Sequence, residues 1–246
     1  MNWNLIISTF KMIVRDKQTL YFSLVFPVLM MVFLKVLFAN TMINGVNYID
    51  FVIPGLVGMS VMQLGVFAVA FVVAQQKEKG IIRRLLATPM RASEFLAAQV
   101  ISRVVISVMQ VLLLISVAIL VLSFAMNGSF LALIVIGIFG SFVFLALGFV
   151  VAGLAKSVEA TPVVGNMIIF PMIFFGDIFF SLNNAPKWVQ TISDYLPIKY
   201  LVDSMREVVV EGSSLIDVKG EILGMAVWLV VLSFIAIKTF SFGTKK

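Results

Sequence analysis

The chain has 246 residues, 61% of them hydrophobic, with a mean hydropathy of +1.12. This composition excludes an ordinary soluble domain and indicates an all-α polytopic membrane protein with a single transmembrane domain over residues 1–246. The net charge of +6 does not predict a nucleic-acid partner, because the basic residues stand between apolar stretches, where membrane topology explains them. Cysteine and histidine are both missing from the sequence, which excludes disulfides, thiol chemistry and imidazole metal ligands.

Residues 1–19 combine an apolar stripe with charges, and we do not expect them to act as a signal peptide. Lys11, Arg15 and Lys17 interrupt the apolar run, and no small-residue cleavage site follows. One helical face carries the apolar side chains Trp3, Ile6, Ile7, Phe10, Ile13 and Val14. We therefore expect an interfacial helix along the cytoplasmic headgroups, the alternative being a simple extension of the first span.

Six apolar stretches follow, each compared with the roughly 20 residues that cross about 30 Å of hydrocarbon. The predicted spans are residues 20–38, 51–74, 104–125, 130–154, 162–180 and 222–237. Only residues 126–129 separate the third span from the fourth, which predicts a tight turn and a helical hairpin. The fourth span carries Gly137 with Ser141 and Gly148 with Ala152, a small-residue spacing that lets helices approach closely.

The distribution of Lys and Arg predicts the orientation. With a cytoplasmic N-terminus, thirteen of these residues lie inside, four lie outside and one, Lys35, lies within a span. Both termini are therefore expected in the cytoplasm. The same count places residues 75–99, a long hydrophilic interruption, on the cytoplasmic side.

The cytoplasmic segment 75–99 predicts a short amphipathic helix over residues 78–86. Ile81, Ile82, Leu85 and Leu86 recur on one helical face. Pro89 ends that helix, and Ser93 with Glu94 is typical of the start of another. The basic residues alone fit topology and contact with anionic lipid, but the apolar face indicates a surface on which a partner docks.

The external segment 181–221 predicts two short amphipathic helices. The first follows Asn184 and Pro186, and the second begins at Pro197. The second helix carries an apolar stripe of Ile198, Leu201, Val202, Met205, Val208 and Val209. We expect both helices on the outer surface, either capping a translocation path or resting at the interface.

The sequence offers little catalytic chemistry. The dipeptide Gly-Lys of a phosphate-binding loop does not occur, and neither does a G-x-S-x-G elbow or a histidine base. We therefore expect no enzyme activity in this chain. The polar residues within the predicted spans are Lys35, Gln63, Gln110, Asn166 and Asp177. Each is a functional candidate because burial in hydrocarbon is costly, although snorkelling or bonds between helices explain them equally well.

Two blocks of sequence resemble the membrane subunits of bacterial type-2 ABC exporters, which include drug, polyketide and polysaccharide exporters. The first block comprises Glu78-Lys79-Gly80, Arg83-Arg84-Leu85-Leu86-Ala87-Thr88-Pro89 and Glu94-Phe95-Leu96. The second block comprises Phe170-Pro171, Gly176-Asp177-Ile178-Phe179-Phe180, Pro186-Lys187-Trp188-Val189 and the run from Leu196 to Arg206. The family commonly has Ser-Gly before the Phe pair and a proline soon after it, where this chain has other residues.

The resemblance implies an N-terminal elbow helix, six spans, a coupling helix, re-entrant helices after the fifth span, and a bacterial or archaeal cell membrane. It also implies two copies of a separate ABC ATPase that binds ATP and Mg²⁺, and a second permease copy in a homodimer or heterodimer. By position, the ATPase-docking residues are Glu78, Gly80, Ile81, Arg83, Arg84, Leu85 and Leu86. The expected substrate path or outer gate comprises Phe174, Phe175, Asp177, Phe179 and Phe180.

The resulting hypothesis is the permease subunit of an ATP-driven exporter for a hydrophobic or amphipathic small molecule. A polysaccharide or lipid-linked glycan exporter of the same family is the first alternative. The 23 Phe against three Trp and four Tyr mildly favour an apolar cargo over a glycan. An ATP-independent six-helix secondary transporter is the second alternative, although the spans offer no acidic residue clearly at mid-membrane.

Overall fold

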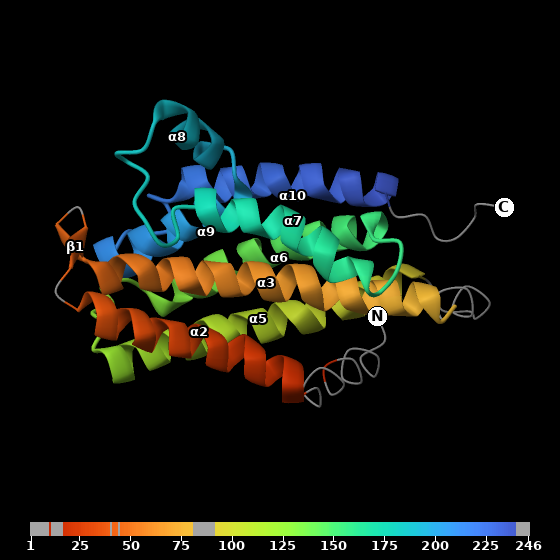
Figure 1. The fold of residues 1–246 in the computed structure, drawn as a ribbon, viewed down its shortest axis with the longest axis horizontal. Coiled ribbons are helices and arrows are strands. Elements are labelled where there is room, and N and C mark those ends of the chain that lie inside the picture. Colours follow the sequence, from red (N-terminus) through yellow and green to blue (C-terminus); the bar gives the residue numbers. More distant parts are fainter. Residues whose placement is uncertain (1–9, 11–16, 40, 44, 81–91, 240–246) are drawn as a thin grey trace.

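The computed structural model describes residues 10, 17–39, 41–43, 45–80 and 92–239, which form an elongated bundle of helices (Figure 1). The predicted N-terminal interfacial helix lies almost entirely outside these ranges. The elements are α2 (Lys17–Phe38), β1 (Met42–Ile43), β2 (Val46–Asn47), α3 (Tyr48–Glu78), α5 (Ala92–Leu122), α6 (Phe130–Leu154), α7 (Ala160–Phe175), α8 (Lys187–Asp194), α9 (Pro197–Arg206), the π-helical turn η1 (Glu207–Glu211) and α10 (Lys219–Thr239). The two short strands form an antiparallel hairpin between α2 and α3.

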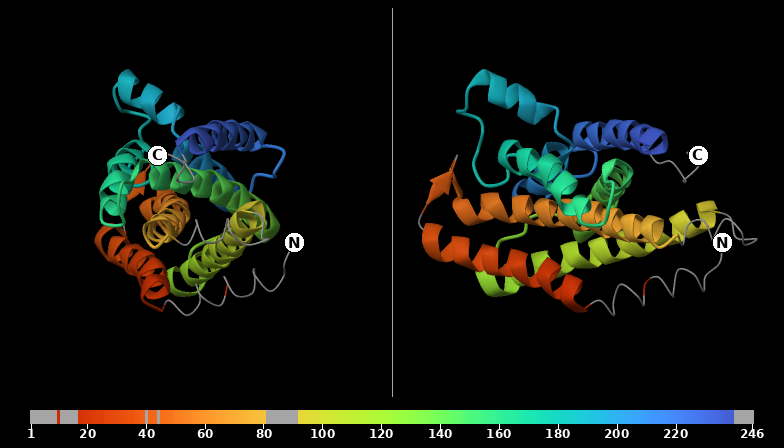
Figure 2. Two further views of the ribbon diagram at one scale, coloured as in Figure 1. Left: turned by 90° about the vertical axis from the view of Figure 1, so that its right-hand side faces the viewer. Right: turned by 45° about the vertical axis from the view of Figure 1, so that its right-hand side comes forward.

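Helix α3 is the centre of the bundle. It contacts α2, α5, α6, α7 and α9, and the end-on view in Figure 2 shows it among these neighbours. Every residue from Phe51 to Met62 is buried. A helix covered on all sides needs apolar residues on all sides, which explains why α3 has no single hydrophobic face.

Helices α3 and α6 approach closely because glycines stand at their contact. A Cβ atom on Gly148 would lie 2.7 Å from the Val66 carbonyl oxygen, and one on Gly65 would lie 2.8 Å from the Phe144 Cβ. The predicted close packing at Gly148 is therefore confirmed. At Gly137 the nearest atom would be 3.6 Å away, an ordinary contact, so this position does not require glycine.

Within the described ranges, four helices are long and apolar enough to cross a membrane. They are α3, the Ala97–Leu122 part of α5, α6 and α10. The apolar part of α2, Leu24–Phe38, and the whole of α7 are shorter. The fold is thus that of a polytopic helical membrane protein. The predicted fifth span over residues 162–180 is too long, because α7 ends at Phe175 and Gly176 follows it.

The connection between α5 and α6 differs from the predicted four-residue turn. Helix α5 ends at Leu122, so seven residues form the linker, and Ser123 adopts a φ of 53°. The Asn127 backbone N–H donates to the Val209 carbonyl oxygen at 3.0 Å, and the Asn127 side-chain amide donates to the Val210 carbonyl oxygen at 2.6 Å. The linker is longer than predicted because it packs on η1, while α5 and α6 still lie side by side.

Helix α9 lies inside the bundle rather than on its surface. The predicted apolar stripe is confirmed, since its six residues are at most 1% exposed, but α9 carries only four of them, and Val208 and Val209 lie in η1. Helix α9 packs on α3, α6 and α10. The predicted surface position is wrong, because Gly58 and Gly140 leave space for Val202 and Leu201 between the long helices. Helix α8, in contrast, exposes Trp188 and Ile192.

Candidate functional site

The residues singled out from the sequence lie at opposite ends of the bundle. Helix α3 ends at Glu78 and Gly80 comes shortly after it, whereas the segment that follows α7 lies near the other end of α3 (Figure 1). With 31 residues at 1.5 Å each, α3 is about 46 Å long. The candidate docking site and the candidate gate are therefore separate sites, connected by the bundle itself.

At the first end, α3 continues past the predicted span and ends at Glu78. The Lys79 N–H donates to the Gln75 carbonyl oxygen at 3.0 Å, and Gly80 follows with a φ of +63°, a left-handed conformation that terminates a helix. A helix beginning at residue 78 is therefore wrong: Glu78 is the exposed last residue of α3. Of the remaining predicted docking residues, Ile81, Arg83, Arg84, Leu85 and Leu86 lie outside the described residues.

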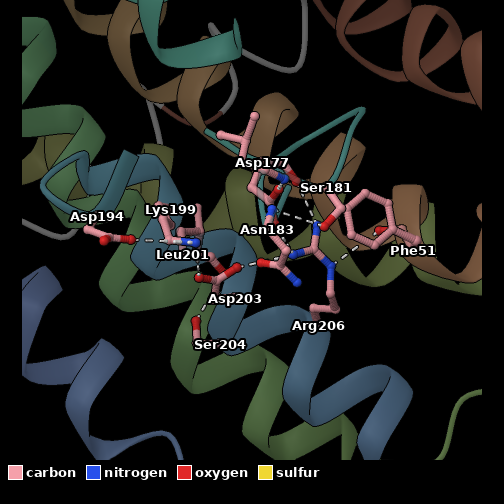
Figure 3. Close-up of polar contacts among 11 residues, drawn as sticks. Phe51, Asp177, Ser181, Asn183, Asp194, Lys199, Leu201, Asp203, Ser204 and Arg206 are labelled. Carbon is pink, nitrogen blue, oxygen red and sulfur yellow. Dashed lines mark hydrogen bonds and ion pairs between the residues drawn. The ribbon is translucent and has the colours of Figure 1, made fainter. Parts of the chain in front are cut away.

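At the other end, Asp177 is buried and paired with a residue far along the chain. It lies in the turn after α7 with a φ of 56°, and its Oδ1 accepts a hydrogen bond from the Leu182 N–H at 2.8 Å. Its Oδ2 accepts from Arg206 Nη1 at 3.0 Å (Figure 3). The side chains of Asp177 and Arg206 are only 9% and 14% exposed. Of the alternatives that the sequence left open for Asp177, the structure shows the paired one.

Arg206 connects three elements through one guanidinium group. Besides the Asp177 carboxylate, it donates to the Asp177 carbonyl oxygen at 2.7 Å and to the Phe51 carbonyl oxygen at 3.4 Å. Its Cζ also lies 4.0 Å from the centroid of the Phe51 ring. The start of α3, the end of α9 and the turn after α7 are thereby held together.

Asp203 and Lys199 extend this network along α9. Arg206 Nη1 donates to Asp203 at 3.1 Å, and Lys199 pairs with the other oxygen of Asp203 at 3.1 Å (Figure 3). Asp194, at the end of α8, lies 4.0 Å from the Lys199 amine. We call Asp177, Arg206, Asp203, Lys199 and Asp194 the ion-pair network. It joins α7, α8 and α9 into one cap over α3.

The candidate gate phenylalanines do not gather around Asp177. Phe174 and Phe180 are 74% and 68% exposed on the outside of the bundle, whereas Asp177 is turned inward. Phe175 is half-buried and meets Trp188 edge-on, with 6.4 Å between the ring centroids. Phe179 is half-buried beside Phe180. The structure thus separates an exposed aromatic surface from a buried ionic network.

Arg103 is a candidate that the sequence interpretation missed, because it was counted among the cytoplasmic charges. It is 3% exposed, within α5. Its guanidinium donates to the Gln99 carbonyl and side-chain oxygens and, at 2.9 Å, to the Ala68 carbonyl oxygen of α3. The buried polar residues Gln99, Arg103, Ser107 and Gln110 recur at helical spacing, and this periodicity is the signal that could have located it. Arg103 ties α5 to α3.

The described residues offer no obvious inorganic site. In these ranges, no group of three or more carboxylate, thiol or imidazole side chains is placed to hold a metal ion. The buried cations Arg206 and Arg103 join helices at two levels of the bundle. An exposed apolar surface lies at the same end as Arg206.

These features define a helical, polytopic membrane protein whose long helices are cross-linked by buried polar contacts. The profile of the ABC-2 type transporter family matches residues 2–210, so the chain belongs to that family.

Three relatives illustrate the range of similarity. The chain is 24% identical over 164 residues to the probable multidrug ABC transporter permease YbhS of Escherichia coli K12, covering 66% of this chain and 44% of that protein. It is 26% identical over 196 residues to the inner membrane transport permease YadH of the same organism, covering 75% and 74%. It is 27% identical over 192 residues to the linearmycin resistance permease protein LnrN of Bacillus subtilis, covering 76% and 47%. The matched region thus spans less than half the length of YbhS and LnrN.

Proposed function

We propose that the chain is the permease subunit of an ATP-driven exporter that moves a hydrophobic or amphipathic small molecule out of the cytoplasm. The observation that carries this proposal is the family match over residues 2–210. YbhS is named a probable multidrug permease and LnrN a linearmycin resistance permease, and these names support a drug-like cargo. The 33 exposed large apolar side chains among the described residues suit a lipid environment and an oily cargo.

The proposed topology has six crossings with both termini in the cytoplasm. The short helices α2 and α7 complete the set with the four longer ones. Helix α9 then enters the bundle from the outside and returns through η1, as a re-entrant segment. Burial of its apolar stripe against α3, α6 and α10 supports this assignment, because irregular backbone at membrane depth needs cover from protein.

ATP and Mg²⁺ are bound, in this proposal, by two copies of a separate ABC ATPase subunit. The absence of a Gly-Lys phosphate loop from the sequence supports a separate nucleotide-binding subunit. Docking occurs at Glu78, Gly80 and the apolar face of Ile81, Leu85 and Leu86. This segment connects α3 directly to α5, so a movement of the docked ATPase reaches two long helices at once.

Transport follows as a rigid-body shift of two permease copies, in a homodimer or a related heterodimer. The exposed aromatic surface of Phe174 and Phe180 lies at the outer end, where the cargo leaves. Asp177 acts there by holding the cap through Arg206 and not by binding cargo, since its carboxylate is already occupied by Arg206 and Leu182. Asp177 is therefore proposed to stabilise the cap and is no longer proposed to contact the cargo directly.

Co-purification tests the docking site. We expect Glu78→Lys and Leu85→Asp to reduce recovery of the ATPase with the tagged permease. Glu211→Lys is the matched control, because it reverses an exposed carboxylate at the opposite end. Undiminished recovery and transport in both docking variants would refute the docking role. A resistance assay against a panel of drug-like compounds, with the ATPase co-expressed, tests the cargo class. Export of a glycan by the permease, without protection against any compound of the panel, would contradict a drug-like cargo.

A further inference from the structure

A cavity of about 240 Å³ lies at the end of the bundle that the proposed topology places outside, and no residue of the ion-pair network lines it. It is bounded by α2, the start of α3, the end of α5 and the residue before α3. Its polar lining comprises Lys35, Asn47, Asp50 and Ser123. Neither the docking segment nor the aromatic surface contributes to it, so it needs an explanation of its own.

Lys35 supplies a cation with unused donors. Its amine donates one hydrogen bond to the carbonyl oxygen of Leu122, an acceptor that the end of α5 leaves without a helical partner. An ammonium group has three N–H donors, and this is the only hydrogen bond that Lys35 makes among the described residues. This bond holds the amine at the cavity wall, and snorkelling of Lys35 stays a prediction.

Asp50 supplies an anion, the opposite charge to that of Lys35, at the same cavity. It is half-buried in the first turn of α3, where the helix dipole favours negative charge. Within the described part of the chain, its carboxylate makes neither a direct hydrogen bond nor an ion pair, although the charge of Lys35 acts on it. Asn47, which precedes α3, makes no capping hydrogen bond with its side chain. A cation, an anion and an amide therefore face one cavity, and no direct hydrogen bond or ion pair joins them among the described residues.

The size and the surroundings of the cavity restrict its ligand. Sites for drug-sized ligands occupy roughly 300–1,000 Å³, so this cavity suits a smaller polar group. Beside it, α2 exposes the large apolar side chains Phe33, Val36 and Leu37, at 57%, 76% and 56%. This combination matches a molecule with a compact zwitterionic head and hydrocarbon chains.

We propose that the cavity binds the headgroup of phosphatidylethanolamine from the outer leaflet. The lipid phosphate accepts hydrogen bonds from Lys35, and the lipid ammonium donates to Asp50. The acyl chains lie along Phe33, Val36 and Leu37. The bound lipid joins α2 to α3 and α5 at the outer end, as Arg206 joins α9 to α3.

Lipid retention tests this proposal with the full-length purified protein. The protein is reconstituted in vesicles of equal phosphatidylethanolamine and phosphatidylglycerol content, extracted in detergent, and its retained lipids are quantified by mass spectrometry. We expect preferential retention of phosphatidylethanolamine. Asp50→Asn, which preserves the shape, should reduce that preference by roughly tenfold, the loss expected for one charge-assisted contact. Lys35→Met removes the phosphate contact that both lipids share, so it should reduce the total amount of retained lipid by a similar factor. Lys187→Met, at the start of exposed α8, is the control and should retain the preference.

Several outcomes would overturn the proposal. Equal retention of both lipids by the unchanged protein would refute recognition of the headgroup, and no retained lipid at all would refute lipid binding. An unchanged preference in Asp50→Asn together with an unchanged amount of lipid in Lys35→Met would place the lipid elsewhere. Displacement by free phosphoethanolamine as effective as displacement by the lipid would assign the cavity to a soluble zwitterion. The measurement needs neither ATP nor cargo, so it is independent of the transport proposal.

Discussion

The contact between Arg206 and Asp177 makes a quantitative prediction about the stability of the outer cap. Replacing Arg206 with Met removes the guanidinium and preserves most of the side-chain volume. The Asp177 carboxylate, 9% exposed, then keeps only the hydrogen bond from Leu182 and loses its cation. The contact with the Phe51 ring is lost as well.

Removal of one partner from a buried ion pair costs about 3–5 kcal/mol, because the other charge remains buried. A protein of this length shifts its melting temperature by roughly 2–4 °C per kcal/mol, so we expect Arg206→Met to lower it by at least about 6 °C. Asp177→Asn combined with Arg206→Met should recover a substantial part of this loss, since the orphaned charge is then removed.

The assay is thermal unfolding of the purified protein in detergent, followed by the near-ultraviolet circular dichroism of its aromatic residues. Lys199→Met is the matched control: it also removes a cation that pairs with Asp203, but the two side chains are 22% and 25% exposed. A more exposed pair is worth less than about 1 kcal/mol. Equal destabilisation by Arg206→Met and Lys199→Met would refute the larger contribution of the buried pair. A double variant that is no more stable than Arg206→Met would refute the cost of the unpaired Asp177 carboxylate.

Three further predictions use the same unfolding assay. Gly148→Ala should destabilise the protein by about 1–3 kcal/mol, because the added Cβ meets the α3 backbone. Gly137→Ala should be neutral or slightly stabilising, because space is available there. Equal effects of the two variants would contradict the close approach of α3 and α6. Arg103→Met should cost less than Arg206→Met, because Arg103 faces carbonyl oxygens and its loss orphans no carboxylate. Burial, reinforced by neighbouring carboxylates, raises the pKa of Glu207 above 4.5, so stability falls as the pH rises from 4.5 through the folded-state pKa. Glu207→Gln should therefore raise the melting temperature at neutral pH, and a gain that persisted below pH 4.5 would disprove this linkage.

The helices themselves could be predicted from the sequence because long apolar runs permit few other structures in a membrane protein. The starts of α6, α8 and α9 and the apolar stripe of α9 all agree with the local patterns. The end of α3 could not be predicted from hydrophobicity, since residues 75–78 are polar and still helical. Its termination depends on the backbone conformation of Gly80.

Burial was harder to predict than helicity. An apolar stripe shows that one face of α9 avoids water, but lipid and protein satisfy that face equally well. The position of α9 inside the bundle depends on Gly58 and Gly140, which belong to distant helices. The same limit applies to charges: the partner of Asp177 lies 29 residues away, and Arg103 resembles a loop residue until its neighbours on α5 are considered.

We propose that this chain acts as a permease that exports its cargo only when a partner subunit hydrolyses ATP. Inverted membrane vesicles containing the permease and its ATPase test it directly, with uptake of a fluorescent hydrophobic compound as the measurement. If export is driven by ATP, we expect uptake with ATP, no uptake with a non-hydrolysable analogue, and persistence of uptake after a protonophore collapses the proton gradient. Uptake that proceeds without the ATPase and disappears with the protonophore would contradict ATP-driven export and identify a secondary transporter.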